Sequence, residues 1–209
     1  DEEQYRVYFM DEDDIISSWH DIPLFDKDDF SNQTCNMVIE IPRFTHAKFE
    51  ISRDLKLNPI IQDQKNGANR YLPNVFPWHG HVCNYGAFPQ TWENPFMEDA
   101  WTGLNGDKDP IDVCEVGSSP LPTGAVVPVR VLGILGLLDS AETDWKVIVI
   151  NSEEAKAKRG MAPVRCAPPG GYNEALKLLL AAGADANGPV AGADGAVPRG
   201  DGGAAARFG

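Results

Sequence analysis

One stretch, residues 106–113, constrains this chain more than any other, and it reads Gly-Asp-Lys-Asp-Pro-Ile-Asp-Val. A glycine that permits unusual backbone angles and a proline that fixes one predict a shaped loop or bulge beside a strand. On a plain strand Asp107 and Asp109 would share a face and Asp112 would point the other way. Because Pro110 interrupts that alternation, we expect all three carboxylates to turn into one cavity.

Carboxylates this close together need compensation. Like charges raise one another's pKa unless a cation joins them. Carboxylate oxygens without a nearby His or Cys suit a hard ion such as magnesium, manganese or calcium. For an Asp-rich loop taken alone, a solvated turn is the alternative. An EF-hand is excluded, because Asp112 stands where that loop needs Gly and Ser118 stands where it needs Glu.

The charge of the whole chain limits its partners. The chain has 209 residues, a net charge of −13 and a pI near 4.6. Nucleic acids and anionic membranes bind basic surfaces, so we expect neither as a direct partner. A phosphate substrate is compatible with this charge, because divalent metals can lie between an acidic site and a polyanion.

The cysteines and the first residues bear on the compartment. The chain contains no Cys-x-x-Cys pair and no zinc spacing among Cys35, Cys83, Cys114 and Cys166. We therefore expect free thiols in a reducing compartment. The acidic start resembles neither a signal peptide nor a transit peptide, which favours the cytoplasm, with an organelle as the alternative.

Alternating apolar residues predict a series of short strands. Strands are expected at residues 5–10, 35–41, 59–63 and 114–116, with one or two buried strands across 124–138. Pro128 and Arg130 interrupt that last apolar run, so we do not expect a membrane span. Acidic turns are expected at 11–14 and 139–144, and a tight turn at 65–67. Many short strands with Gly and Pro turns and few helices are typical of a small β-barrel.

The composition changes near residue 151. We expect one domain over residues 1–151 and a divergent tail over 152–209, with a helix start at 153–159 and a second helix at 174–182. Residues 181–209 consist mostly of Ala and Gly. Such side chains bury too little apolar area to order the chain, so we expect disorder there.

Polar residues inside the predicted strands point to further contacts. Glu40 lies in an apolar strand, where a carboxylate is costly without a partner. Lys48 and Glu50 share one strand face, and from the spacing alone a cross-strand salt bridge is the simplest interpretation. His79 and His81 have a spacing that permits zinc binding, but no third ligand with suitable spacing is evident.

Several stretches in a fixed order carry a resemblance to a known family. They are Val-Ile-Glu-Ile-Pro-Arg at 38–43, Ala-Lys-Phe-Glu at 47–50, Asn-Pro-Ile-Ile-Gln-Asp at 58–63, Phe-Pro-Trp-His-Gly at 76–80, Asn-Tyr-Gly-Ala-Phe-Pro-Gln-Thr-Trp-Glu at 84–93, the acidic loop at 106–113, and Leu-Asp-Ser-Ala-Glu-Thr-Asp-Trp-Lys-Val at 138–147. From about residue 5 to residue 150, the chain resembles family I soluble inorganic pyrophosphatases of the eukaryotic type. The resemblance implies a mainly β (α+β) fold: an OB-like five-stranded β-barrel with flanking hairpins and few helices.

The same resemblance implies a function and a set of site residues. It implies hydrolysis of inorganic diphosphate to two phosphates with several Mg²⁺ ions, for which Mn²⁺ can substitute, in a possible homodimer. Asp109 would orient the attacking water and take its proton. The implied metal ligands are Asp107, Asp112 and Asp144 for the first ion, and Asp139 and Glu50 for further ions. The implied phosphate-contacting residues are Lys48, Arg70, Tyr85 and Lys146, with Glu40 as an outer carboxylate.

The chain departs from the family pattern at two places. His81 stands where the family has a Tyr that is proposed to donate a proton. Imidazole can also donate, but it loses its proton nearer neutral pH than a phenol does. The family's Tyr-Lys-x-Pro-Asp-Gly-Lys run, which clasps one phosphate, does not occur after Tyr85, because Tyr172 is followed by Asn173.

Residues 174–187 resemble instead the second half of one ankyrin repeat, with a chance amphipathic helix as the alternative. The tail is then a fused fragment, a misjoined gene product or a divergent end. These departures leave a second reading open, a catalytically weak or inactive domain that binds metal or phosphate. A barrel that binds oligonucleotides is disfavoured by the net charge of −13.

Overall fold

The computed structural model describes residues 5–25 and 34–157. Strands make up most of the secondary structure in these ranges, together with one short helix, α1 (Ser152–Ala157). No helix in the described ranges is long and apolar enough to cross a bilayer. The predicted helix at 174–182 and the Ala- and Gly-rich residues 181–209 lie outside the described residues.

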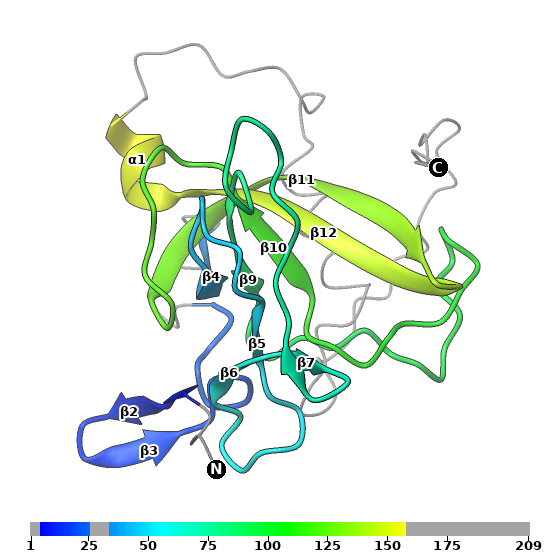
Figure 1. The fold of residues 1–209 in the computed structure, drawn as a ribbon, viewed down its shortest axis with the longest axis horizontal. Helices are drawn as coiled ribbons and strands as arrows, with labels where there is room; N and C mark the ends of the chain where they lie inside the picture. The colour runs from blue at the N-terminus through cyan, green and yellow to red at the C-terminus, as the bar shows by residue number, and fades with distance from the viewer. Residues whose placement is uncertain (1–4, 26–33, 158–209) are drawn as a thin grey trace.

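Five strands close into a barrel in the order β10-β12-β11-β4-β9 (Figure 1). They are β4 (Thr34–Ile41), β9 (Asn84–Ala87), β10 (Asp112–Glu115), β11 (Val126–Asp139) and β12 (Glu142–Asn151). Neighbouring strands are antiparallel except β10 and β12, which run parallel. The prediction of a mainly β, OB-like five-stranded barrel is confirmed.

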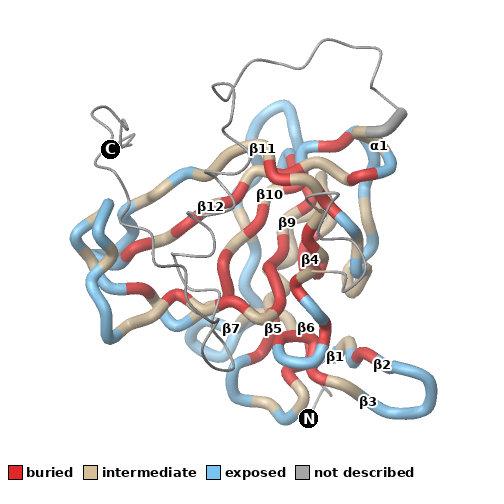
Figure 2. The backbone as a smooth tube through the Cα atoms, turned by 180° about the vertical axis from the view of Figure 1, so that it is seen from behind, coloured by how far each residue is buried: buried red, intermediate tan, exposed pale blue. Residues whose placement is uncertain are grey.

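The alternation of β4 fills two hydrophobic cores at once. Met37 and Ile39 point into the barrel and pack with Val113 and Val147. Val38 points to the other face and joins a second cluster. Because successive strand residues face opposite sides, a strand that is apolar on both faces belongs between two packed layers. Figure 2 shows the resulting buried band along β4, β9 and β10.

The second cluster attaches a flanking layer to the barrel. This layer contains a three-stranded sheet of β1 (Arg6–Val7), β6 (Ile60–Gln62) and β5 (Phe49–Ile51), and the hairpins β2 (Phe9–Asp11)–β3 (Asp14–Ile16) and β7 (Gln64–Lys65)–β8 (Ala68–Asn69). Ile51 and Ile60 pack from the sheet against Val38 of the barrel. In the predicted turn at 65–67, Asn66 and Gly67 both have positive φ, of 56° and 77°, which suits a two-residue hairpin.

The β11–β12 hairpin corrects one prediction. The run at 124–138 contains a single long strand, β11, in which only Val129 and Val131 are buried. Leu135 and Leu138 are 45% and 52% exposed, because the distal hairpin extends past the barrel (Figure 1). At its tip Ser140 and Ala141 have φ values of 49° and 67°, and they form a two-residue turn within the stretch 139–144, where an acidic turn was predicted.

Candidate active site

The acidic loop before β10 is held in shape by backbone contacts. A Cβ on Gly106 would lie 2.4 Å from the backbone carbon of Glu93, so only glycine fits there. The N–H of Asp109 donates to Oδ1 of Asp107 at 2.8 Å, and Lys108 between them has a φ of 81°. The N–H of Ile111 donates to Oγ1 of Thr91 at 3.0 Å. The loop is therefore shaped, as its Gly and Pro residues predict.

The loop leads into a row of charges on the outside of the barrel. Asp112 at the start of β10 lies directly opposite Lys146 of β12, and Asp144 lies two residues earlier on the same face of β12. Nζ of Lys146 donates to Oδ2 of Asp112 and to Oδ1 of Asp144. Burial lowers the pKa of Lys146, but the two carboxylates outweigh burial and leave it raised. Lys146 is therefore a fixed ammonium shared by two carboxylates.

Aromatic side chains lie beside this charge cluster. The Tyr85 hydroxyl hydrogen-bonds Asp112, and Nζ of Lys146 lies 5.7 Å from the centroid of the Tyr85 ring. Burial and then the charge of Asp112 raise the pKa of Tyr85 well above its usual value, so the phenol remains a donor. The His81 ring stacks on Tyr85 with a centroid distance of 4.8 Å.

Asp109 lies apart from Asp112, against a cation that the sequence did not single out. NH1 of Arg53 lies 3.1 Å from Oδ1 of Asp109 and also donates to the carbonyl of Asp107 at 3.2 Å. The Asp109 side chain is 47% exposed. Partial burial and the charge of Asp107 raise the pKa of Asp109 to about 6, although Arg53 opposes them.

A second polar group lies on the flanking layer. Nζ of Lys48 lies 2.5 Å from Oε2 of Glu50 and 3.1 Å from Oδ2 of Asp63, and NH1 of Arg70 lies 2.8 Å from the same Asp63 oxygen. The partner of Lys48 from the neighbouring segment is therefore Asp63, whereas Glu50 lies two residues farther along the chain, within β5. Sequence reasoning missed Asp63, although the pairing of Phe49 with Gln62 places it opposite Lys48.

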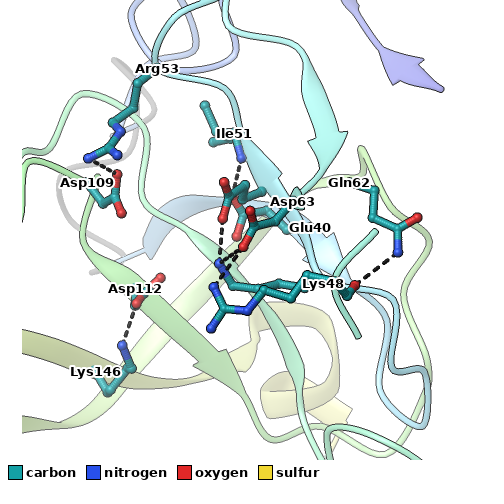
Figure 3. A network of polar contacts seen from close by, with 11 residues as sticks. Glu40, Lys48, Ile51, Arg53, Gln62, Asp63, Asp109, Asp112 and Lys146 are labelled. Carbon is teal, nitrogen blue, oxygen red and sulfur yellow. Dashed lines mark hydrogen bonds and ion pairs between the residues drawn. The ribbon is translucent and has the colours of Figure 1, made fainter. Parts of the chain in front are cut away.

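Figure 3 shows that these contacts face one region between the flanking layer and the barrel. The pairs Arg53–Asp109, Lys48–Asp63 and Lys146–Asp112 come from separate segments of the chain. The structure thus brings acids and cations together from the acidic loop, β12 and the strands of the flanking layer.

Two buried glutamates stand behind the exposed charges. Oε1 of Glu40 accepts the Ile51 N–H at 2.6 Å, and burial and then Asp112 raise the pKa of Glu40 well above its usual value. Oε1 of Glu93 accepts the Trp145 N–H at 2.8 Å, whereas its Oε2 has no partner among the described residues. Burial raises the pKa of Glu93 to about 9. Sequence reasoning did not single out Glu93, because nothing in its spacing shows that it is buried.

Two of the three loop carboxylates have different cations as partners, and the convergence of all three on one cavity stays a prediction. Within residues 5–25 and 34–157, no three His, Cys, Asp or Glu side chains are arranged to hold a metal ion. Arg53 holds Asp109, and Lys146 holds Asp112 and Asp144.

Asp139 and His79 have other contacts. Asp139 is exposed at the end of β11, where Oγ of Ser140 donates to it at 3.1 Å. Among the described contacts, none joins Asp139 to the Lys146 cluster. His79 packs edge-on against His46 with a centroid distance of 4.3 Å.

Known proteins resemble this chain in sequence and in fold. The family model described as "Inorganic pyrophosphatase" matches residues 37–168. The chain belongs to the inorganic pyrophosphatase family. The Candida albicans inorganic pyrophosphatase is 49% identical over 155 residues, which cover 74% of this chain and 53% of that protein. The Homo sapiens inorganic pyrophosphatase is 51% identical over 156 residues, which cover 74% of this chain and 52% of that protein.

The structure of the inorganic pyrophosphatase from Schistosoma japonicum matches with a TM-score of 0.70 and 51% identity, over 74% of this chain and 54% of that one. The resemblance to family I, eukaryotic-type pyrophosphatases is therefore confirmed. The chain spans about half the length of the curated relatives it matches. The family match runs to residue 168, and the division of the chain near residue 151 stays a prediction.

The donor set of this family member suits a hard divalent cation. Asp112 and Asp144 present carboxylate oxygens to one point, and an ammonium already lies there. The chemistry of these carboxylates therefore fits a divalent ion.

Proposed function

We propose that this chain hydrolyses inorganic diphosphate to two phosphates with Mg²⁺, or with Mn²⁺ in its place. The observation that carries the proposal is the cluster of Asp112, Asp144, Lys146 and Tyr85 on the barrel wall of an inorganic pyrophosphatase family member. Curated relatives near 50% identity are named inorganic pyrophosphatases. The family match over residues 37–168 includes the cluster.

The metal ligands are proposed from the same cluster. Asp107, Asp112 and Asp144 would hold the first ions, and Glu50 and Asp139 would add ligands for others. Bound divalent ions supply a water of lowered pKa and neutralise charge on the phosphates. Glu40, buried behind Asp112, would stabilise this arrangement from the barrel side.

Asp109 is the proposed general base. A base is most effective when its pKa lies near the working pH, and that of Asp109 is raised to about 6. Arg53 holds one Asp109 oxygen, which leaves the other to orient the attacking water and take its proton.

The substrate is proposed to bind the cations of the flanking layer. Lys48 and Arg70 would contact phosphoryl oxygens, and Arg70 can bind two oxygens at once, which Lys cannot. Asp63 contacts both cations and so positions them for one substrate. From the barrel wall, Lys146 and Tyr85 would donate to the developing negative charge. His81, stacked on Tyr85, is the proposed proton donor in place of the usual tyrosine.

Phosphate release from diphosphate tests this function directly. Release is measured with Mg²⁺, with Mn²⁺ and with EDTA, on the full chain and on Asp109→Asn. We expect metal-dependent release that Asp109→Asn lowers strongly while the fold, followed by circular dichroism, is unchanged. Equal release in EDTA, or an Asp109→Asn variant as fast as the parent, would contradict the mechanism.

A second candidate function is metal and phosphate binding with little turnover. One observation favours it: Tyr172, the last tyrosine of the chain, is not followed by the Lys that the family uses to clasp a phosphate. Titration calorimetry with Mg²⁺ and with phosphate separates the two functions. Binding without phosphate release selects the second, and release selects the first.

Three further expectations belong to this proposal. A homodimer and a cytoplasmic location are proposed by analogy with the family and are tested by sedimentation and by fractionation. Nucleic acid is not proposed as a partner, and a single-stranded oligonucleotide should not shift with the chain at low salt.

A further inference from the structure

Arg53 joins the flanking layer to the acidic loop. It lies two residues after the end of β5, and its NH1 lies 3.1 Å from Oδ1 of Asp109 and donates to the carbonyl oxygen of Asp107 at 3.2 Å. Two oxygens of the loop thus fix the end of a side chain that is 47% exposed. The proposed function gives Arg53 a single task, which is to hold Asp109.

Most of the hydrogen-bonding capacity of this guanidinium is open. A guanidinium has five N–H donors, two on each terminal nitrogen and one on Nε. NH1 makes both contacts of Arg53, and within residues 5–25 and 34–157 neither Nε nor NH2 has a partner. Lys48 and Lys146 differ, because each already contacts two carboxylates. Arg53 can therefore hold Asp109 and bind an anion with its other edge at the same time.

Asp109 brings this open edge into the proposed site. The charges of Glu50 and Asp112 both act on Asp109, and Figure 3 shows the Arg53–Asp109 pair facing the same region as Lys48 and Lys146. A phosphorus attacked by a water on the Asp109 carboxylate lies at most about 7 Å from that carboxylate, because the base-to-water and water-to-phosphorus distances are each about 3 Å. Oxygens on that phosphorus are within reach of a guanidinium held 3.1 Å from the same carboxylate.

We propose that Arg53 is a substrate-binding residue, whose Nε and NH2 bind two oxygens of the phosphoryl group under attack while NH1 keeps Asp109 in place. The inference rests on the proposed function. A bidentate contact between arginine and phosphate is charge-assisted and fixes the orientation of both groups. One planar group would then position the base relative to the phosphorus, and its charge would lie where negative charge develops on the phosphoryl oxygens.

Binding of methylenediphosphonate, whose P–C–P bridge cannot be hydrolysed, tests the contact without turnover. Titration calorimetry with Mg²⁺ compares the full chain with Arg53→Gln and Arg53→Lys. We expect the affinity to fall about tenfold or more in Arg53→Gln. Arg53→Lys should lose most of that affinity too, because an ammonium cannot bind two oxygens as a guanidinium does. Lys56→Gln, which removes an exposed cation of the same segment, is the matched control and should bind like the parent.

A second pair of variants separates a substrate contact from an effect that acts through Asp109. Asp109→Asn and the double variant Asp109→Asn/Arg53→Gln are titrated in the same way. If Arg53 binds the substrate, Arg53→Gln also weakens binding in the Asp109→Asn background. If Arg53 only holds Asp109, its removal has no effect on affinity in that background, and the inference is wrong. Parent-like binding by Arg53→Gln, or an equal loss in Lys56→Gln, would also overturn it.

Phosphate release is then measured on the same variants. We expect Arg53→Gln to raise the KM for diphosphate roughly tenfold and to lower kcat as well, because it removes a substrate contact and releases the base. A lower kcat with the KM and the affinity for methylenediphosphonate unchanged would assign Arg53 to Asp109 alone and overturn the inference. A parent chain that binds methylenediphosphonate but releases no phosphate would refute the proposed hydrolysis, and the titrations would still decide the role of Arg53.

Discussion

The two sides of the candidate site are built differently. On the barrel side, Asp112 and Lys146 are direct neighbours on parallel strands, and Val113 and Val147 of the same strands are fully buried in the barrel core. On the flanking side, Lys48, Asp63 and Arg70 lie at the ends of short strands, and Arg70 is 45% exposed.

The difference separates two tasks. The barrel wall holds carboxylates in a backbone that close packing prevents from shifting. The flanking layer holds cations on a smaller sheet that is joined to the barrel through a second cluster. We therefore expect changes in the wall to act on metal dependence and turnover, and changes in the flanking layer to act on the affinity for diphosphate.

The largest effect should come from the wall. Asp112→Asn removes a charge that Lys146 and Tyr85 both contact and that the proposed metals require. We expect phosphate release to fall by roughly 10²-fold or more, at any Mg²⁺ concentration. Asp13→Asn, exposed in the β2–β3 turn, is the matched control and should leave release unchanged. A rise in the KM for diphosphate with kcat unchanged would contradict the assignment of the barrel wall to turnover.

Glu93 tests how strongly burial behind the barrel wall disfavours the charged form of a carboxyl group. Its pKa is raised from 4.5 to about 9 by burial. The folded state thus holds the proton more tightly than the unfolded state, so this group's stabilisation is full below about pH 4.5 and is lost as pH rises toward about 9. Glu93→Gln carries no such charge. Its free energy of unfolding, relative to the parent, should rise across this window by up to about 1.4 kcal/mol per pH unit.

Urea unfolding of both chains in EDTA, at several pH values across that window, measures this difference. Glu142→Gln, an exposed glutamate at the hairpin tip, is the control and should show a flat difference. A flat difference for Glu93→Gln as well would contradict the pKa and its cause.

A smaller effect is expected in the flanking layer. Asp63→Asn removes the carboxylate that contacts both Lys48 and Arg70. Without it the two cations are no longer positioned for one substrate, so the KM for diphosphate should rise roughly tenfold, with a smaller change in kcat. Steady-state kinetics measures the changes in KM and kcat separately, with Asp54→Asn, an exposed aspartate between β5 and β6, as the control. A loss in kcat alone would show that both sides serve turnover.

The smallest effect is expected at His81, which stacks on Tyr85 and is the proposed proton donor. A phenol keeps its proton to higher pH than imidazole does. His81→Tyr should therefore extend phosphate release to more alkaline pH, by about one pH unit or more. The measurement is the pH–rate profile of the parent chain and of His81→Tyr. Identical profiles would rule out His81 as the proton donor.

Much of the fold followed from local patterns. Alternation along 35–41 predicted β4, the Asn-Gly pair at 66–67 predicted a hairpin turn, and the many short strands predicted a barrel. The run at 124–138 was misjudged in its burial, because apolar composition does not show that half of a hairpin extends beyond its barrel.

For the candidate site too, some features followed from the sequence and others only from the tertiary structure. The sequence by itself determined the residue types, the acidic loop and the family, because motifs and spacing are local properties. Only the tertiary structure decided the partners: Asp63 for Lys48, Arg53 for Asp109 and Lys146 for Asp112. Periodicity assigns a side chain to a face of its strand. Its neighbour is set by strand register and barrel closure, which join segments far apart in the chain.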